Sequence, residues 1–482
     1  MQKQLFTTTI LYSLLVFLQP LVSLLLQPYY LAHFSDYEYG VFSLMASFTH
    51  LVQFVGALSI GHSVFTFYYD YSDKPEQLKT YLGQVLSFTL YSVSIVVLLA
   101  YFLGDTFFYY FFKDDQLSFY PYGWLALISG LGYTFIVPFT SYLRNEKAIR
   151  WYTLLVMVNV LLSFLAQIWF IGYYNLGVVG ALGGKALGVL ASVALVLFAN
   201  RKYLQVRLQF STYLQGPFRF IRYDLPNKLV QWAYLFIDRF IVERLLSVSL
   251  VGVYSLLNVA VSTVDMAAAA FRSAILPFLY EAFKDEENDK TSEARVQLLY
   301  DFYIFLVVLA ISGIVFLVGH LHYIVSKASF LGIQQYVSIY VLGYLFSSIT
   351  DMVYLEFLYH KNAKRVLYYT LSVLVLLCLF SISFIGKFAL WGIVYALVLA
   401  KFLNVIIVCI TFPTLLQRLS SLKIKVFLAY CLVSNLSTHF IFIPYQYVNY
   451  AQAGFFQLSI FVLIALWIEP RIIQKVLSYT KQ

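Results

Sequence analysis

The feature that most constrains the fold of this chain is a series of long apolar runs. A helix needs about 20 apolar residues to cross the hydrocarbon of a bilayer, and roughly fourteen runs of that length are separated by polar or turn-forming breaks. The sequence therefore predicts an all-α integral membrane protein with about 14 transmembrane helices. The runs lie at about 7–32, 40–68, 81–103, 122–142, 151–173, 178–199, 223–245, 251–276, 297–319, 336–359, 366–385, 390–411, 425–444 and 452–469.

Composition excludes a soluble protein and argues against a nucleic-acid partner. Of the 482 residues, 61% are hydrophobic and only 11% are charged, which is more apolar surface than a soluble core could bury. The net charge of +9 does not indicate nucleic acid, because the basic residues lie in short loops rather than on one face of a polar domain. Cys378, Cys409 and Cys431 fall inside apolar runs without metal-ligand or disulfide spacing, so we expect neither a metal site nor a disulfide.

The distribution of Lys and Arg predicts the orientation. Short loops rich in these residues stay cytoplasmic. If the amino terminus is inside, roughly 23 of the 32 basic residues lie in inner loops and tails. The outer loops then hold only Lys113, Arg244, Lys327 and Lys387. We therefore expect a multi-pass membrane protein with both termini cytoplasmic and membrane lipids around it.

An internal repeat divides the runs into two halves. Residues 40–44 (GVFSL) open the second run and residues 252–256 (GVYSL) open the eighth. Two further echoes, at offsets of 212 to 217, pair Tyr152-Thr153 with Tyr369-Thr370 and Gly180 with Gly392. Six helices per half is an even number, which predicts parallel repeats and a cavity between two lobes. The expected organisation is a six-helix lobe at 1–200, a cytoplasmic linker at 201–222, a second six-helix lobe at 223–412, and two additional helices with a cytoplasmic tail at 413–482.

Several ionisable side chains lie inside these runs. A charge at a helix centre costs about 2.5 to 3.5 kcal/mol on insertion scales, so the charges that persist usually face a water-filled cavity or a partner. Lys185 and Lys401 have no acid at helical spacing, and Arg272 shares its run only with Asp265, so all three predict a cationic cavity wall. The intramembrane set comprises Lys185, Lys228, Asp238, Arg239, Asp265, Arg272, Asp351, Glu356, Lys401 and His62.

Some of these charges can be explained by a structural role instead of a role in a cavity wall. Asp224 and Lys228 are four residues apart, as are Arg239 and Glu243, so local ion pairs with snorkelling account for both sets. His62 fits either a cavity wall or a hydrogen-bonded interior histidine. A cavity with surplus positive charge attracts an anion, and Lys and Arg bind phosphate through charge-assisted hydrogen bonds. Aromatic faces bind sugar rings, so a lipid diphosphate that carries sugars suits these residues.

The order of motifs resembles the polysaccharide-repeat flippases, the Wzx-like family of O-antigen flippases. These belong to the multidrug, oligosaccharidyl-lipid and polysaccharide (MOP) exporter superfamily. The likeness covers nearly the whole chain, in a six-plus-six-plus-two layout. It rests on residues 36–40 (DYEYG), 143–147 (LRNEK), 176–181 (LGVVGA), Pro226, 237–240 (IDRF) and 251–255 (VGVYS).

The resemblance implies a non-enzymatic transporter of the bacterial cytoplasmic (inner) membrane that acts in polysaccharide biosynthesis. Such a protein carries undecaprenyl-diphosphate-linked O-antigen or capsule repeat units from the inner to the outer leaflet by alternating access. It implies substrate-binding roles for Arg272, Lys228 and Lys185, to which the residues themselves add Lys401, His62 and Arg239. It further implies no bound cofactor, coupling to a proton or sodium gradient through Asp238 or Asp265, and partners such as a polysaccharide polymerase and other assembly proteins.

Two other function classes compete with this interpretation. A multidrug exporter of the same superfamily shares the architecture, but its cationic substrates favour an acidic cavity. A membrane-embedded glycosyltransferase or polymerase would use carboxylates such as Asp36 and Glu38 to hold a metal in an outer loop. That loop is only about seven residues long, and the large outer loops that enclose a glycan are missing.

Overall fold

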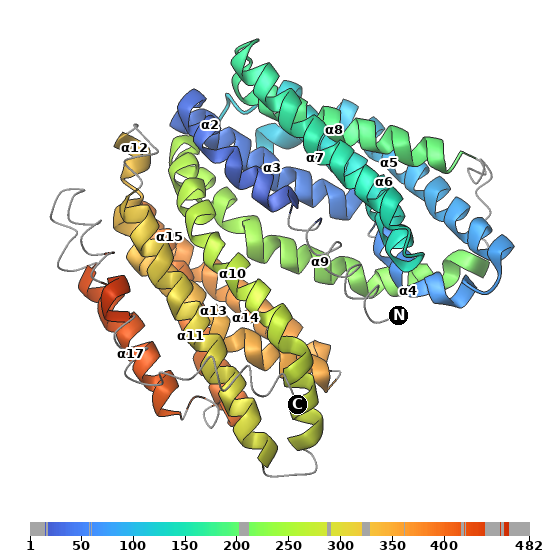
Figure 1. Ribbon diagram of the computed structural model, residues 1–482. Helices are drawn as coiled ribbons and strands as arrows, with labels where there is room; N and C mark the ends of the chain where they lie inside the picture. The colour runs from blue at the N-terminus through green and yellow to red at the C-terminus, as the bar shows by residue number, and fades with distance from the viewer. Residues whose placement is uncertain are drawn as a thin grey trace. The chain divides into compact units, whose positions relative to one another are not determined.

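The protein is all-helical in the part of the chain that the computed structural model describes (Figure 1). That part comprises residues 15, 18–56, 58, 60–201, 212–286, 291–320, 328–360, 362–415, 419, 421–438, 454 and 457–461. Most of the expected last run, residues 202–211 of the expected linker and the expected cytoplasmic tail lie outside it. Nine of the described helices are long and apolar enough to cross a membrane.

The first compact unit comprises residues 1–252. Helices α6, α7 and α8 follow the expected runs closely, whereas α5 and α9 extend well beyond them. Proline marks the start of α5, where a missing N–H costs nothing. The helices are α2 (Gln27–His33), α3 (Asp36–Gly56), α4 (Ile60–Tyr71), α5 (Pro75–Phe111), the short η1 (Phe119–Gly123), α6 (Trp124–Asn145), α7 (Ile149–Gly172), α8 (Gly177–Ala199) and α9 (Thr212–Leu245), and α10 (Val248–Glu286) begins here.

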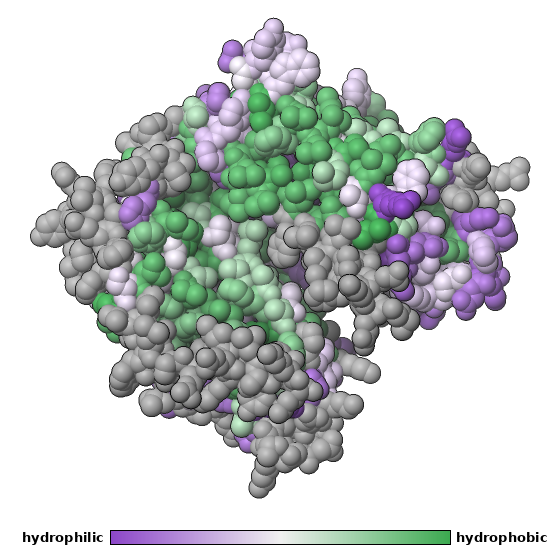
Figure 2. Space-filling view, in the orientation of Figure 1, coloured by the Kyte–Doolittle hydropathy of each residue, from purple (hydrophilic) through white to green (hydrophobic). Residues whose placement is uncertain are grey.

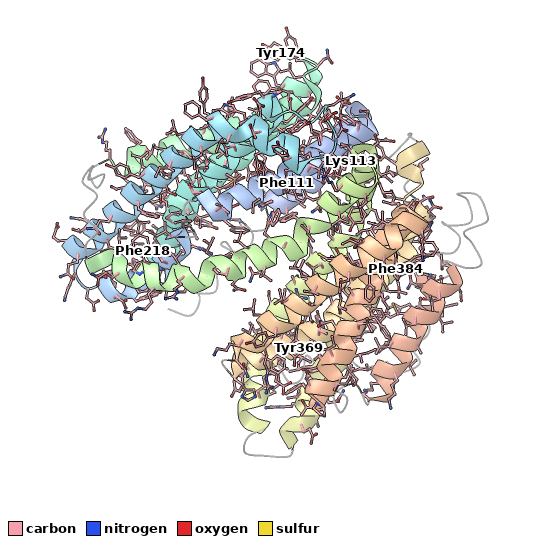
Figure 3. All side chains as sticks on the ribbon, turned by 180° about the vertical axis from the view of Figure 1, so that it is seen from behind. Phe111, Lys113, Tyr174, Phe218, Tyr369 and Phe384 are labelled. Carbon is pink, nitrogen blue, oxygen red and sulfur yellow. The ribbon has the colours of Figure 1, made fainter. Side chains whose placement is uncertain are left out.

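The second unit comprises residues 253–482 and holds the rest of α10. Its long hairpin is formed by α14 and α15, and the range predicted for the latter, 390–411, matches its observed bounds. In Figure 3, Tyr369 and Phe384 mark the two halves of α14. The helices are α11 (Thr291–Gly319), α12 (Ala328–Leu331), α13 (Gln334–Tyr359), α14 (Ala363–Phe388), α15 (Leu390–Thr411) and α17 (Leu422–Ser437).

The second expected run is two helices rather than one. The chain breaks between α3 and α4, where Leu58 has a positive φ of 48°. α4 is therefore a short helix of 12 residues, and neither α3 nor α4 is among the nine candidate spans. α9 is also not among them because it carries many charged residues, although it is 34 residues long.

The repeat predicted from sequence recurs in the packing. α7 packs most extensively on α8, as α14 does on α15, and α6 contacts α8 as α13 contacts α15. Gly180 lies against Phe170 of the preceding helix, and Gly392 lies against Phe384 in the same place of the second hairpin. The units divide at Gly252 rather than within 201–222, because α9 packs on α3, α4 and α5 of the first unit.

Glycines bring the backbones of α7 and α8 close together. A Cβ atom at Gly184 would lie 2.6 Å from the backbone nitrogen of Gln167, and one at Gly188 would lie 2.6 Å from the carbonyl oxygen of Asn159. Together with Gly180, these residues form a stripe of glycines at every fourth position, the pattern that permits close helix approach in membranes. Larger residues would force the hairpin apart.

Exposed aromatic and aliphatic side chains cover the helices where lipid would lie. Figure 2 shows a broad hydrophobic area on the first unit with hydrophilic residues toward its ends. Tyr109, Tyr110 and Tyr173 are each more than 70% exposed, as expected of an aromatic belt at the membrane interface. In Figure 3, Lys113 and Phe218 lie toward opposite ends of α9. These features are those of a multi-pass membrane protein.

Candidate functional site

Arg272 of α10 is the centre of an ion-pair cluster in the second unit. Its Nη1 atom donates to the Asp351 carboxylate of α13 and to the Tyr303 hydroxyl of α11, at 3.2 Å in the latter case. Its Nη2 atom lies 3.7 Å from Oδ1 of Asp265, which is two turns earlier on the same face of α10. The Arg272 and Asp351 side chains are only 21% and 25% exposed, so solvent screens this pair weakly.

Lys401 of α15 lies at the edge of the same cluster. Its ammonium group is 4.3 Å from the centroid of the Tyr344 ring, a cation–π contact. The Tyr344 hydroxyl in turn donates to Oδ1 of Asn258 at 3.3 Å. Lys401 is buried and its charge acts on the Asp351 carboxylate. The charges of two cations and two carboxylates therefore nearly cancel within this cluster.

The expectation that Arg272 is an unpaired cation was wrong. Asp351 comes from a helix 79 residues further along the chain and supplies the partner that helical spacing did not reveal. Asp351 was noted as an intramembrane charge but not as a site residue. The clue would have been that an intramembrane Asp needs a cation, as Arg272 needs an anion.

Cations without ion pairs gather in the first unit instead. The side chain of Lys185 on α8 is half-buried and makes no ion pair or hydrogen bond with any described residue. The Arg239 guanidinium on α9 lies 5.1 Å from the Phe236 ring centroid and donates to the Leu235 carbonyl at 3.2 Å. Its Nε atom is buried and has no partner among the described residues. No carboxylate pairs with either cation within the described part of the chain.

His50 of α3 links these two cations. Its imidazole stacks on Phe236, with ring centroids 5.1 Å apart and planes inclined by 13°. Lys185 and Arg239 both act electrostatically on this ring. Next to it, the indole of Trp232 donates to the Ser47 carbonyl at 2.9 Å and fixes α9 against α3. We call Lys185, His50 and Arg239 the cationic cluster.

The remaining predicted site residues lie in different surroundings. The predicted ion pairs Asp224–Lys228 and Arg239–Glu243 are not formed: Lys228 is half-buried without an ion pair, and Oδ2 of Asp224 is buried without a partner among the described residues. The buried Asp238 carboxylate accepts the backbone N–H of Arg239 at 2.8 Å. His62 belongs to α4, but its side chain lies outside the described part.

Glu243 forms a different contact from the one predicted. Its Oε1 atom accepts the backbone N–H groups of Lys113 and Asp114, at 2.7 and 3.1 Å. The side chain is 2% exposed. Glu243 therefore anchors the segment after α5 to the end of α9, and Arg239 is left without a carboxylate.

Asp36 and Glu38, the carboxylates considered for a metal site, lie in the first turn of α3. Oε2 of Glu38 accepts the backbone N–H and the hydroxyl of Ser35, at 2.8 and 2.9 Å. The Ser35 hydroxyl accepts the Glu38 N–H in return, at 3.2 Å. This reciprocal arrangement is a capping box, so Glu38 starts a helix.

His50 was missed because only His62 was considered in the second run. The signal was present, since an ionisable residue inside an apolar run is a site candidate by default. The partnership of Lys185, His50 and Arg239 could not be predicted, because they come from three helices that are far apart in the sequence.

Comparison with known proteins identifies the fold. No family description and no curated protein sequence matches the chain. Among solved structures, the lipid II flippase MurJ in an inward closed conformation has a TM-score of 0.71 at 17% identity, over 95% of this chain and 99% of that one. An inward-facing multidrug resistance transporter of the MATE family has a TM-score of 0.63 at 16% identity, over 86% and 99%.

A third similar structure is a mutant of the Vibrio cholerae MATE transporter VcmN, with a TM-score of 0.53 at 14% identity, over 88% of this chain and 98% of that one. Identities this low establish the architecture and leave the substrate open. The chain has the all-helical membrane fold that the MurJ lipid II flippase and the MATE transporters share.

Proposed function

We propose that this protein is a flippase of lipid-linked oligosaccharide. It would carry undecaprenyl-diphosphate-linked O-antigen or capsule repeat units from the inner to the outer leaflet of the cytoplasmic membrane by alternating access. The observation that carries the proposal is the cationic cluster, because Lys185 and Arg239 have no carboxylate partner in the described part of the chain. A diphosphate would supply the missing negative charge through charge-assisted hydrogen bonds.

The similarity to MurJ supports the proposal, since that protein is a lipid II flippase and the likeness extends over 95% of this chain. Arg272 and Lys401 would then act differently from Lys185 and Arg239. Asp265 and Asp351 already neutralise the second-unit cluster, so an incoming diphosphate would have to displace a carboxylate there. We therefore place the first diphosphate contacts at Lys185 and Arg239, with Lys228, His62 and Arg272 as further candidates.

Energy coupling and partners are part of the same proposal. Asp238 or Asp265 would couple transport to a proton or sodium gradient. A polysaccharide polymerase and other assembly proteins would receive the flipped unit on the outer face, with both termini of the flippase in the cytoplasm.

A multidrug exporter is the second candidate, and one observation favours it. The Asp265 and Asp351 carboxylates of the second unit could attract an organic cation once Arg272 moves away. The fold of the MATE transporters supports this candidate as well. The two functions differ in the sign of the substrate charge.

The test is the leaflet distribution of lipid-linked repeat units in cells that lack the protein. Inner-membrane vesicles of known sidedness would be treated with an impermeant glycan-modifying reagent. We expect repeat units to accumulate only in the cytoplasmic leaflet. Single units on the outer leaflet would instead place the defect in polymerisation, and unchanged repeat units together with increased sensitivity to cationic drugs would establish the exporter.

A further inference from the structure

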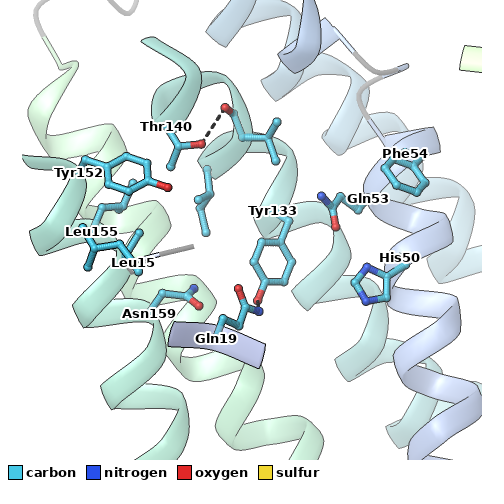
Figure 4. Close-up of a pocket in the computed structure, with 13 residues that line it drawn as sticks. Leu15, Gln19, His50, Gln53, Phe54, Tyr133, Thr140, Tyr152, Leu155 and Asn159 are labelled. Carbon is cyan, nitrogen blue, oxygen red and sulfur yellow. Dashed lines mark hydrogen bonds between the residues drawn. The ribbon is translucent and has the colours of Figure 1, made fainter. Parts of the chain in front are cut away.

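The first unit contains a half-open cavity that the cationic cluster does not account for. Its volume is about 360 Å³, at the lower end of the roughly 300–1,000 Å³ usual for small-molecule sites. Residues of the first run, α3, α6 and α7 line it (Figure 4). All of these residues belong to the first compact unit.

The cavity wall offers neutral hydrogen-bonding groups. Nε2 of Gln19 donates to the Tyr133 hydroxyl at 3.1 Å. Facing them from α7, Nδ2 of Asn159 has no hydrogen-bond partner among the described residues, although the Asn159 side chain is only 7% exposed. Figure 4 shows Tyr133 and Gln19 between Asn159 on one side and Gln53 with His50 on the other. A buried amide donor that is left unpaired favours a ligand with an acceptor oxygen.

The chemistry of the wall excludes charged ligands. Among the described lining residues there is no Asp, Glu, Lys or Arg, so the cavity does not suit a metal ion, an organic cation or the diphosphate itself. Amide groups, the Thr140 hydroxyl and the rings of Tyr133 and Tyr152 share the wall with the apolar side chains of Leu15, Phe54, Ile136, Val137, Leu155 and Val156. Such a mixture of amides, hydroxyls and aromatic rings suits a neutral ring that carries many hydroxyl groups, which is a sugar.

His50 connects this cavity to the cationic cluster. It lines the cavity and stacks on the Phe236 ring, which the Arg239 guanidinium also contacts, and the charge of Lys185 acts on the imidazole. A diphosphate held by these two cations would therefore present its attached sugar at the edge of the cavity that His50 forms.

We propose that this cavity is a sugar-binding subsite, in which Asn159, Gln19 and Tyr133 contact a sugar of the lipid-linked oligosaccharide while Lys185 and Arg239 hold its diphosphate. The inference rests on the proposed flippase function and adds to it. The cavity would set which glycans are accepted, whereas the cationic cluster would accept any lipid diphosphate.

The experiment compares binding of two lipids to the full-length protein in nanodiscs. One probe is the lipid-linked repeat unit purified from cells that lack the protein, and the other is undecaprenyl diphosphate without sugar. The variants are Asn159→Leu, which keeps the volume but removes the amide, and Thr140→Val from another wall. Lys185→Ala tests the diphosphate contact, and Asn404→Leu in the second unit is a matched control for loss of a buried amide.

We expect Asn159→Leu to weaken binding of the glycan-bearing lipid by about tenfold and to leave binding of undecaprenyl diphosphate unchanged. Thr140→Val should act in the same direction with a smaller effect. Lys185→Ala should weaken both probes equally, and Asn404→Leu should leave the ratio of the two affinities as it is. Thermal unfolding of each variant establishes that the folded protein is compared.

The outcomes separate the two proposals. If the wild-type protein binds neither lipid, the flippase function itself fails. If it binds both lipids equally well, or if Asn159→Leu and Thr140→Val leave the preference for the glycan unchanged, the cavity holds only water and the sugar subsite is refuted. An equal loss for both probes in Asn159→Leu also refutes it, because the amide would then support the fold or the diphosphate rather than the sugar.

Discussion

Gly40 and Gly252 pack reciprocally where α3 and α10 begin. A Cβ atom on Gly40 would overlap the carbonyl oxygen of Val248, four residues before Gly252, and a Cβ on Gly252 would overlap that of Asp36, four residues before Gly40. The two glycines are also the repeat positions at the start of the GVFSL and GVYSL segments. The missing side chain of each glycine therefore leaves space for the first turn of the other helix.

Replacing either of these glycines with Ala should destabilise the protein. The added methyl group meets backbone rather than a movable side chain, so the two helix starts must separate, at a cost of about 1–3 kcal/mol per site. Thermal unfolding in detergent measures the effect. Gly313→Ala and Gly386→Ala are the matched controls, since nothing lies within 4 Å of a Cβ there. Equal stability of the Gly40 and Gly313 variants would contradict the packing argument.

Lys185→Ala should weaken binding of undecaprenyl diphosphate without lowering stability. A charge-assisted hydrogen bond contributes about 1.5–3 kcal/mol, which corresponds to roughly 10- to 100-fold in affinity. Because Lys185 forms no ion pair with a described residue, its removal leaves no carboxylate unpaired. Arg should restore part of the affinity. Lys387→Ala, at an exposed position near the end of α14, is the control, and a similar loss there would point to a nonspecific surface effect.

Arg272→Ala and Asp351→Asn should each destabilise the second unit, and the double variant should lose less than the sum. Each single change leaves a partly buried charge without its partner, at a cost of about 2 kcal/mol. A double-mutant cycle of unfolding free energies measures the coupling. Additive losses would mean that the two side chains do not stabilise each other.

Glu243→Ala should loosen the segment that follows α5. The change removes the acceptor for the partly buried backbone N–H groups of Lys113 and Asp114, and each lost hydrogen bond costs about 1 kcal/mol. Faster hydrogen exchange at residues 113 and 114 is the expected result. Glu243→Gln retains an acceptor oxygen and should preserve most of the protection; protection that survives in the Ala variant would disprove the anchor.

The helices themselves could be predicted closely because apolar length and turn residues determine them locally. The range 390–411 matches α15, whereas 40–68 was predicted as one helix and is two. The break at Leu58 lies in a mostly apolar stretch, where Gly56, Ser59 and Gly61 are the weak turn signals nearby. A positive φ that tertiary packing imposes on one residue is not indicated by the sequence around it.

The candidate site could be predicted only in part, for a related reason. Lys185 and Arg239 could be predicted because a charge inside an apolar run is visible in the sequence alone. The pairing of Arg272 with Asp351 and the approach of His50 to Lys185 depend on which helices are neighbours, and helical spacing within one run does not report this. Asn159 and Tyr133 appeared unremarkable, because an uncharged polar residue in a membrane helix usually bonds to its own backbone.

The glycine stripe of α8 has a consequence for how the protein can move. An alternating-access transporter needs some helices that slide past their neighbours and others that stay fixed. Two helices whose backbones are in direct contact have no side chains between them that could rearrange, so they do not slide. Gly188 lies against the carbonyl of Asn159, so the stripe locks α8 onto the same turn of α7 that presents the unpaired amide to the cavity. The α7–α8 hairpin should therefore move as a rigid body and keep the shape of its cavity wall throughout the transport cycle.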